Sequence, residues 1–292
     1  MIRKKKSIIS QSIMHFVFIV LALICVLPLI LTISVSFTDD AALRTYGYSF
    51  IPRVFSLDAY RYLFANSRVI IDAYLVTIFA TVVGTLLHVF VVSLYAYAIS
   101  RSDFRFRKQF TFFMFFTMLF NGGTVSWFLV NNSIGLTNTI WALVLPYAFS
   151  AWHCIIMRTF FKTSIPAALI ESAKMDGAGE YRTFFRIVLP LSLPGLATIG
   201  LFATLLYWND WWLPLMLMNN SDISNIQFLL YNMMANVQAV ANNPGVFVPG
   251  VRLPAESIRM AMAVITIGPI VLAYPFFQRH FIEGLTIGAV KE

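Results

Sequence analysis

The sequence predicts an all-helical protein that crosses a membrane several times. Of its 292 residues, 59% are hydrophobic and only 12% are charged, and the mean hydropathy of +0.77 is far above that of a soluble globular domain. The apolar residues gather in runs of about 20 or more, which is the length that a helix needs to cross the hydrocarbon core. Because lipid offers no partner to open backbone groups, these runs should be helices.

Six apolar runs are long enough to span the membrane. They lie near residues 12–36, 69–99, 109–130, 139–161, 188–218 and 258–278. The first run follows a basic stretch, as in a secretory signal, but it is too long for one and no small-residue cleavage pattern follows it, so we expect it to remain attached. No repeat or linker separates the runs, and a single transmembrane domain over residues 1–292 is the simplest organisation.

The distribution of Lys and Arg predicts that both termini face the cytoplasm. One side of the six spans would carry fifteen basic residues: Arg3, Lys4, Lys5, Lys6, Arg101, Arg105, Arg107, Lys108, Arg158, Lys162, Lys174, Arg182, Arg186, Arg279 and Lys291. The other side would carry six: Arg44, Arg53, Arg61, Arg68, Arg252 and Arg259. Short loops with an excess of basic residues stay inside the cell. The net positive charge does not indicate nucleic-acid binding, because basic clusters beside apolar runs are topology signals and no nucleic-acid-binding fold is visible.

Two segments would then face the outside. "SLDAYRYLF", residues 56–64, is typical of a short amphipathic helix at the interface, with Ser56 as its cap. The loop over residues 219–257 contains "IQFLLYNMMANVQAV", which favours a helix, and "NNPGVFVPG", which favours turns.

An unusually polar stretch separates the fourth and fifth runs. In "TSIPAALIESAKMDGAGE", Ser164 can cap a helix, Pro166 fits the first turn, residues 167–176 favour helix, and Gly177 can end it in the left-handed conformation. The side chains of Ile165, Ala168, Leu169 and Ser172 would share one face. A helix of about three turns is not stable alone and needs a surface to pack on. That surface could be the membrane itself.

The stretch "ESAKMDGAGEYRTFFRIVLP", residues 171–190, resembles the coupling loop of permease subunits of ATP-binding-cassette importers. That loop reads Glu-Ala-Ala, three residues, Gly, nine residues, Ile, one residue, Leu-Pro. The matching positions here are Glu171, Ala173, Gly177, Ile187, Leu189 and Pro190, with Ser172 in place of the middle alanine. In the family this loop docks on the ATPase. The resemblance therefore implies the type I importer permease fold, with residues 164–186 forming a coupling helix and Pro190 leading directly into the fifth span.

Further segments are similar to the maltose-type permeases, and within them to a multiple-sugar, complex-saccharide branch. They are "SLYAYAISR", "FNGGTVSWFLVNNSIGLTNT", "LPAESIRMAM" and "YPFFQRHFIEGLTIGAVKE". The resemblance implies a bacterial cell membrane, a second, similar permease, two ATPase subunits that bind ATP and Mg, an extracytoplasmic solute-binding protein and a saccharide substrate. It also implies that a tail of Gly288, Ala289, Val290 and Lys291 contacts the ATPases. The alternative for the tail is a frayed terminus.

The candidate substrate residues lie in "LLYWNDWWLPL", residues 205–215. Counted along the fifth span, Asp210 would lie about 9 Å beyond the membrane midplane, where an ionisable group by default faces protein or water. On a continuous helix, Tyr207, Asp210, Trp211 and Pro214 would share a face. Trp208 and Asn209 belong to the same group, and an acceptor among aromatic rings suits a sugar. The carboxylate slightly favours a neutral saccharide, and an acidic one such as a uronate would need positive charge from the second permease or from Arg252. The alternative is an interfacial aromatic belt.

"FNGG", residues 120–123, predicts a break in the third span, and Asn121 could line a cavity there. Asp72 is more simply an interface residue. Two other classes of function are alternatives: an ion-coupled secondary transporter, in which Asp72 and Asp210 would carry protons, and an intramembrane enzyme. The four histidines show no HExxH pairing and the chain has no Walker loop, so the sequence predicts no metal, no cofactor and no catalysis in this chain; ATP would be hydrolysed by partner subunits.

Overall fold

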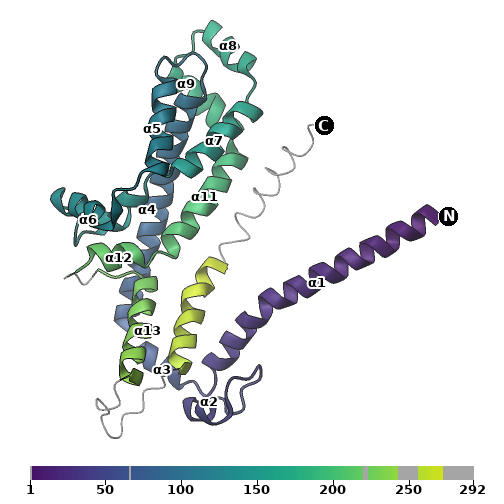
Figure 1. Cartoon of the computed structure of the whole chain (residues 1–292), viewed down its shortest axis with the longest axis vertical. Helices are drawn as coiled ribbons and strands as arrows, with labels where there is room; N and C mark the ends of the chain where they lie inside the picture. Colours follow the sequence, from purple (N-terminus) through teal and green to yellow (C-terminus); the bar gives the residue numbers. More distant parts are fainter. Residues whose placement is uncertain (1, 66, 220–222, 243–255, 272–292) are drawn as a thin grey trace. The chain divides into compact units, whose positions relative to one another are not determined.

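The computed structural model describes residues 2–65, 67–219, 223–242 and 256–271, and it is helical in nearly all of them (Figure 1). Within these residues the extended pairing is limited to one isolated bridge between Thr38 and Phe55. The chain forms two compact units, one from residues 1–70 and 232–268 and the other from residues 71–231 and 269–292.

The first unit contains the N-terminal helices. These are α1 (Ile2–Ser36), α2 (Asp40–Tyr46) and α3 (Asp58–Ala65). Asp39 caps α2 by accepting the N–H groups of Ala41 and Ala42. Ser56 Oγ accepts the N–H of Asp58, which confirms the serine predicted to start α3.

Residues 256–271 form a further helix, whose first residues are tied to α2 and to the segment after it. Tyr48 donates to Glu256 at 2.8 Å, and the Glu256 N–H donates to Asp40 at 3.1 Å. The Glu256 carboxylate raises the pKa of Tyr48 above its usual value because it accepts that hydroxyl proton and carries negative charge beside it.

The second unit is built around most of α4 (Ser67–Ser100). Its other elements are α5 (Arg107–Leu119), α6 (Gly123–Ser133), η1 (Ile140–Leu143), η2 (Leu145–Tyr147), α7 (Ala151–Ser164), α8 (Ala167–Met175), α9 (Glu180–Thr183), the π-helical η3 (Phe184–Val188), α10 (Leu189–Leu191), α11 (Leu193–Trp208), α12 (Trp212–Leu217) and the start of α13 (Ile226–Asn242). The helix predicted within residues 219–257 is thus present as α13.

Only some of the predicted spans are straight helices. Residues Gln11–Ser36 and Arg68–Ser100 are each long and apolar enough to cross a membrane unbroken. Three further spans are pairs of helices bent by 118° after Leu119, by 49° after Tyr147 and by 80° after Leu191. The described residues therefore hold up to five spans by length and composition; the predicted sixth, 258–278, is helical as far as residue 271 and then lies outside them.

The core of the second unit packs α4 against α5, α7 and α11. Its buried apolar side chains include Val92, Ala96, Ile99, Met114, Cys154, Met157, Phe161, Val188 and Ile199. Gly84 lets the ring of Tyr207 approach α4, since an added Cβ at Gly84 would lie 2.5 Å from that ring. The ring cannot swing away freely, because its hydroxyl donates to the Val144 carbonyl at 2.8 Å.

Four charged side chains and one tyrosine join α8 to the end of α4, and we call them the ion-pair cluster. Its members are Tyr97, Arg101, Asp103, Lys174 and Glu180. Arg101 binds Asp103 through two N–H groups at 3.0 and 2.7 Å. Lys174 Nζ lies 2.6 Å from Asp103 and 2.7 Å from Glu180. Because three of these side chains are 37–54% exposed, each pair contributes only about 0–1 kcal/mol to the free energy of unfolding.

We predict that Gly84→Ala destabilises the protein by about 1–3 kcal/mol, because the new methyl group overlaps a tethered ring. The measurement is the midpoint of thermal unfolding in detergent. Gly179→Ala is the matched control, because nothing lies within 4 Å of a Cβ at that position. A Gly84→Ala protein as stable as the control would contradict the packing described here.

Candidate functional site

Helix α8 ends as the sequence predicts. Gly177 has a φ of 76°, and its N–H donates to the Lys174 carbonyl at 3.0 Å while that of Ala178 donates to Ala173 at 2.9 Å. These bonds satisfy carbonyls that the end of the helix leaves open. The start of the helix differs from the prediction: α7 continues through Ser164, so Ser164 does not cap α8, and Pro166 occupies the N-cap position without a side-chain bond.

The two faces of α8 are chemically different. Ile170 and Ala173 are buried against the rest of the second unit, at 8% and 7% exposure. Glu171 and Ser172 are exposed, as are Leu169 at 40% and Met175 at 89%. Ile165, which the sequence predicts on one face with Ala168, Leu169 and Ser172, is buried because it belongs to the turn after α7 and not to α8.

The remaining coupling-loop residues lie at the junction with α11. Ile187 and Leu189 are half-buried and Pro190 is exposed. Pro190 has no N–H to give to the carbonyl one turn earlier, and the chain before it takes the π-helical form, in which Leu189 N–H donates to Phe184 O. The sequence predicts that Pro190 leads directly into the fifth span. In the structure the chain instead bends by 80° around Ser192 before α11 begins.

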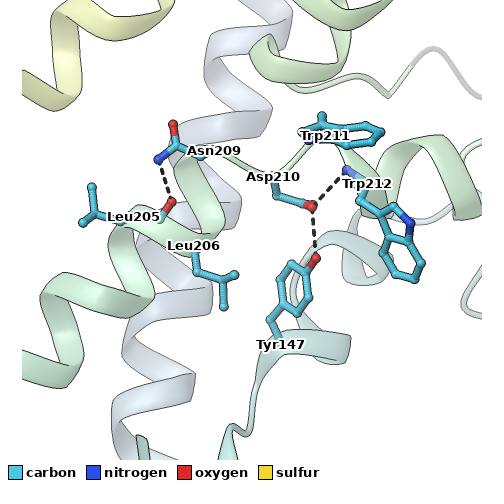
Figure 2. A pocket seen from close by; sticks show the side chains of 7 residues that line it. All are labelled: Tyr147, Leu205, Leu206, Asn209, Asp210, Trp211 and Trp212. Atoms are coloured by element: carbon cyan, nitrogen blue, oxygen red, sulfur yellow. Dashed lines mark hydrogen bonds between the residues drawn. The ribbon is translucent and has the colours of Figure 1, made fainter. Parts of the chain in front are cut away.

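A pocket of about 490 Å³ lies where α11 ends (Figure 2). Its lining consists of Tyr147, Leu205, Leu206, Asn209, Asp210, Trp211 and Trp212. Three of the predicted substrate residues, Asn209, Asp210 and Trp211, are therefore brought together.

Asp210 occupies a break in the helix. α11 ends at Trp208 and α12 begins at Trp212. The Asp210 Oδ1 atom accepts the N–H of Trp212 at 3.1 Å and the hydroxyl of Tyr147 at 3.2 Å (Figure 2). It also accepts the N–H of Leu213 at 3.2 Å. The helical face predicted for Tyr207, Asp210, Trp211 and Pro214 is therefore wrong, because this carboxylate bonds the first amides of a new helix.

Side chains just before and at the start of α13 bond the residues between α11 and α12. Asn225 donates from Nδ2 to the carbonyl of Asp210 and accepts the N–H of Phe228 at 2.9 Å. Gln227 donates to Asn209 Oδ1 at 3.1 Å. The pocket lining is thus held by side chains from the start of α13, which the sequence places in a separate loop.

The aromatic candidates divide into exposed and buried rings. Trp211 is 42% exposed and stacks on Tyr231, with ring centroids 4.9 Å apart and 15° between the planes. Tyr207 and Trp208 are 1% and 6% exposed and do not line the pocket. Trp212, which was not among the predicted residues, lines the pocket and packs on Trp127 at 4.7 Å.

A pair of histidines, His88 and His153, contacts the backbone of the pocket residue Tyr147. His88 Nδ1 lies 2.7 Å from the carbonyl of Tyr147, and its Nε2 lies 2.8 Å from His153 Nδ1. A carbonyl only accepts, so His88 Nδ1 carries the donated proton. Sequence reasoning missed this pair because its members are 65 positions apart and no spacing signal joins them.

The other candidates lie elsewhere. Asn121 Oδ1 accepts the N–H of Gly123 at 2.8 Å in the bend between α5 and α6, which confirms the predicted break but places Asn121 outside the pocket lining. Asp72 is exposed on α4. The tail residues Gly288, Ala289, Val290 and Lys291 lie outside the described residues. Among the described residues, no group of three or more His, Cys, Asp or Glu side chains could hold a metal ion.

Comparisons with known proteins agree with this architecture. Residues 90–286 match the family described as binding-protein-dependent transport system inner membrane component. The polygalacturonan/rhamnogalacturonan transport system permease protein YtcP of Bacillus subtilis (strain 168) is 43% identical over 92% of this chain and 94% of its own length. The arabinooligosaccharides transport system permease protein AraQ of Halalkalibacterium halodurans is 29% identical over 99% of both chains.

A solved structure shares the fold. It is the crystal structure of a bacterial ABC transporter involved in the import of the acidic polysaccharide alginate, with a TM-score of 0.80, 28% identity, and coverage of 94% of this chain and 96% of that one. The family is the membrane permease component of such importers and not their ATPase. The chain therefore belongs to the inner membrane components of binding-protein-dependent transport systems, as a permease subunit of an ATP-binding-cassette importer.

Proposed function

We propose that this permease imports oligosaccharides that contain uronic acid. It would do so with a second, similar permease, two ATPase subunits that bind ATP and Mg²⁺, and an extracytoplasmic binding protein. The observation that carries the substrate class is the 43% identity over 92% of the chain to a permease named for polygalacturonan and rhamnogalacturonan. The structure that shares the fold belongs to an importer of alginate, which is also acidic.

The pocket at the end of α11 is the proposed point of contact with the saccharide. Trp211 offers a half-exposed ring face and Asn209 an exposed amide, which suit the apolar faces and the hydroxyl edges of a sugar. The charge of Asp210 is partly offset, because its Oδ1 accepts three hydrogen bonds from inside the protein. The seven lining residues include no Lys or Arg, so the base that binds a uronate would come from the second permease or from the binding protein.

Helix α8 is the proposed contact with the ATPase. Glu171, Ser172 and Leu169 form its free side, and Ala173 fixes the helix to the permease from the buried side. The π-helical junction with Ile187, Leu189 and Pro190 joins α8 to α11. By the same proposal the tail residues Gly288 to Lys291 reach the ATPases. An ATPase can drive the pore only if it binds two states of the permease unequally, and α8 would carry that difference.

We expect Gly177→Pro to abolish uptake while the chain still reaches the membrane. Proline holds φ near −65°, whereas Gly177 has φ 76° and donates its N–H to Lys174. The readouts are uptake of labelled oligosaccharide and the amount of permease in membrane fractions. Gly177→Asn is the matched control and should keep most of the uptake, because asparagine tolerates the left-handed region. Normal uptake by the proline variant would count heavily against the role of α8.

Trp211→Ala should lower the apparent affinity of uptake by about two- to tenfold, since an exposed ring that stacks on a ligand contributes about 0.5–1.5 kcal/mol beyond its buried area. The concentration dependence of uptake measures this change. Trp141→Ala is the control, because Trp141 is 48% exposed but lies outside the pocket. Equal effects of the two substitutions would exclude the pocket as the saccharide site.

The substrate class is tested on the cognate binding protein. We expect oligogalacturonates to raise its thermal midpoint by several degrees, because a ligand that binds only the folded state stabilises it by mass action. Neutral oligosaccharides of the same length should have little effect. Stabilisation by the neutral series alone would overturn the assignment to acidic substrates and would leave the permease role intact.

A further inference from the structure

The ion-pair cluster forms a connection between α8 and α4 that does not pass along the backbone between them. Lys174 of α8 binds Asp103, which follows α4, and Glu180 of α9. Tyr97 of α4 donates to Glu180 at 2.9 Å, and Arg101 lies 3.9 Å from the same carboxylate. Every acid in the cluster therefore contacts more than one donor, and Lys174 joins both acids.

The charges of the cluster persist at neutral pH. Arg101 and Lys174 both donate to Asp103 and hold the pKa of its carboxyl well below its usual range. Asp103 and Glu180 raise the pKa of Lys174 in turn. Because each group is stabilised in its charged form, changes of pH within the physiological range do not break the connection.

Helix α4 leads directly from this cluster to the pocket. It runs unbroken for 34 residues, and the distance along its axis from Arg101 to His88 is about 20 Å at a rise of 1.5 Å per residue. His88 binds the carbonyl of Tyr147, whose hydroxyl binds Asp210. Further along α4, Thr85 bonds Thr204 of α11 at 3.3 Å and Gly84 contacts the ring of Tyr207.

The route along the backbone from α8 to the same pocket is less regular. It passes through the π-helix η3 and then through the 80° bend around Ser192 before α11 begins. Such irregular segments can absorb a displacement. Helix α4 is unbroken over 34 residues, and a continuous secondary-structure element is one of the structures that carry coupling between distant sites.

We propose that Lys174 is a positioning residue that couples movement of α8 to α4 and through it to the pocket. This inference rests on the proposed docking of the ATPase on α8. Movement of α8 would then reach the pocket by two routes, through the ion-pair cluster to α4 and through the loop that continues into α11.

The first test compares uptake per ATP hydrolysed in proteoliposomes that hold the complete transporter. Lys174→Met removes the charge and keeps the apolar stem, and it should lower this ratio by about fivefold or more, the lower end of typical coupling between sites. Lys174→Arg should restore it, since it can still bind both acids. Lys162→Met is the matched control, because Lys162 is exposed and has no ion pair among the described residues.

The second test measures the link between α8 and α4 without substrate. Spin labels are placed on cysteines introduced at Met175 of α8, which is 89% exposed, and at Phe90 of α4, which is 47% exposed. The exposed Cys25 is replaced by Ser and the buried Cys154 is retained. The wild-type transporter should give one narrow distance in each nucleotide state, whereas Lys174→Met should give a broad distribution.

The outcomes separate the two proposals. A Lys174→Met transporter with wild-type distances and wild-type uptake per ATP would overturn the role of Lys174. A loss of uptake in Lys174→Met that Lys174→Arg does not restore would also overturn it, since charge would not be the cause. A wild-type complex without ATP-driven uptake would instead overturn the proposed function, and the spin-label distances would still decide whether the cluster ties α8 to α4.

Discussion

A chain in lipid must give every backbone N–H and C=O a partner, and at three breaks between helices in the described residues polar side chains supply such partners. At the end of α11, Asp210 accepts two amides of α12 and Asn225 donates to its carbonyl. At the start of α6, Asn121 accepts the amide of Gly123. Near η2, His88 donates to the carbonyl of Tyr147 and Tyr207 to that of Val144. Breaks supported in this way can line a path for a polar solute without exposing open backbone to lipid.

This constraint changes the role of Asp210. A carboxylate at membrane depth suggests a ligand contact by default, but here one of its oxygens is used for three hydrogen bonds within the protein. The exposed side chains of the pocket are its neighbours Asn209 and Trp211. The Asn209 amide bonds the Leu205 carbonyl and Gln227, and the Trp211 ring stacks on Tyr231. Asp210 therefore shapes the pocket, and its neighbours are the side chains that a sugar would meet.

The sequence predicts the helical class, α8 and its end at Gly177, α13 and the break at "FNGG", because apolar runs, Pro and Gly act locally. It does not predict the break after Trp208. Residues 205–215 read as one helix. The break is held by the local amides of Trp212 and Leu213, which donate to Asp210, and also by Tyr147 and Asn225, which no periodic pattern joins to it. The pairing of His88 with His153 and of Lys174 with Asp103 was missed for the same reason, since contacts between distant residues leave no periodic signal. The number of spans and the orientation of the termini stay predictions.

Under the proposed function, α8 is the part of this permease on which the ATPase acts. Its most direct measurement is photo-crosslinking from Leu169, Glu171 and Ser172, one position at a time, in membranes where the transporter is active. We expect a crosslink to the ATPase from each of these exposed positions, and none from the buried Ile170. Uninterrupted uptake in membranes where none of the three positions reaches the ATPase would contradict it.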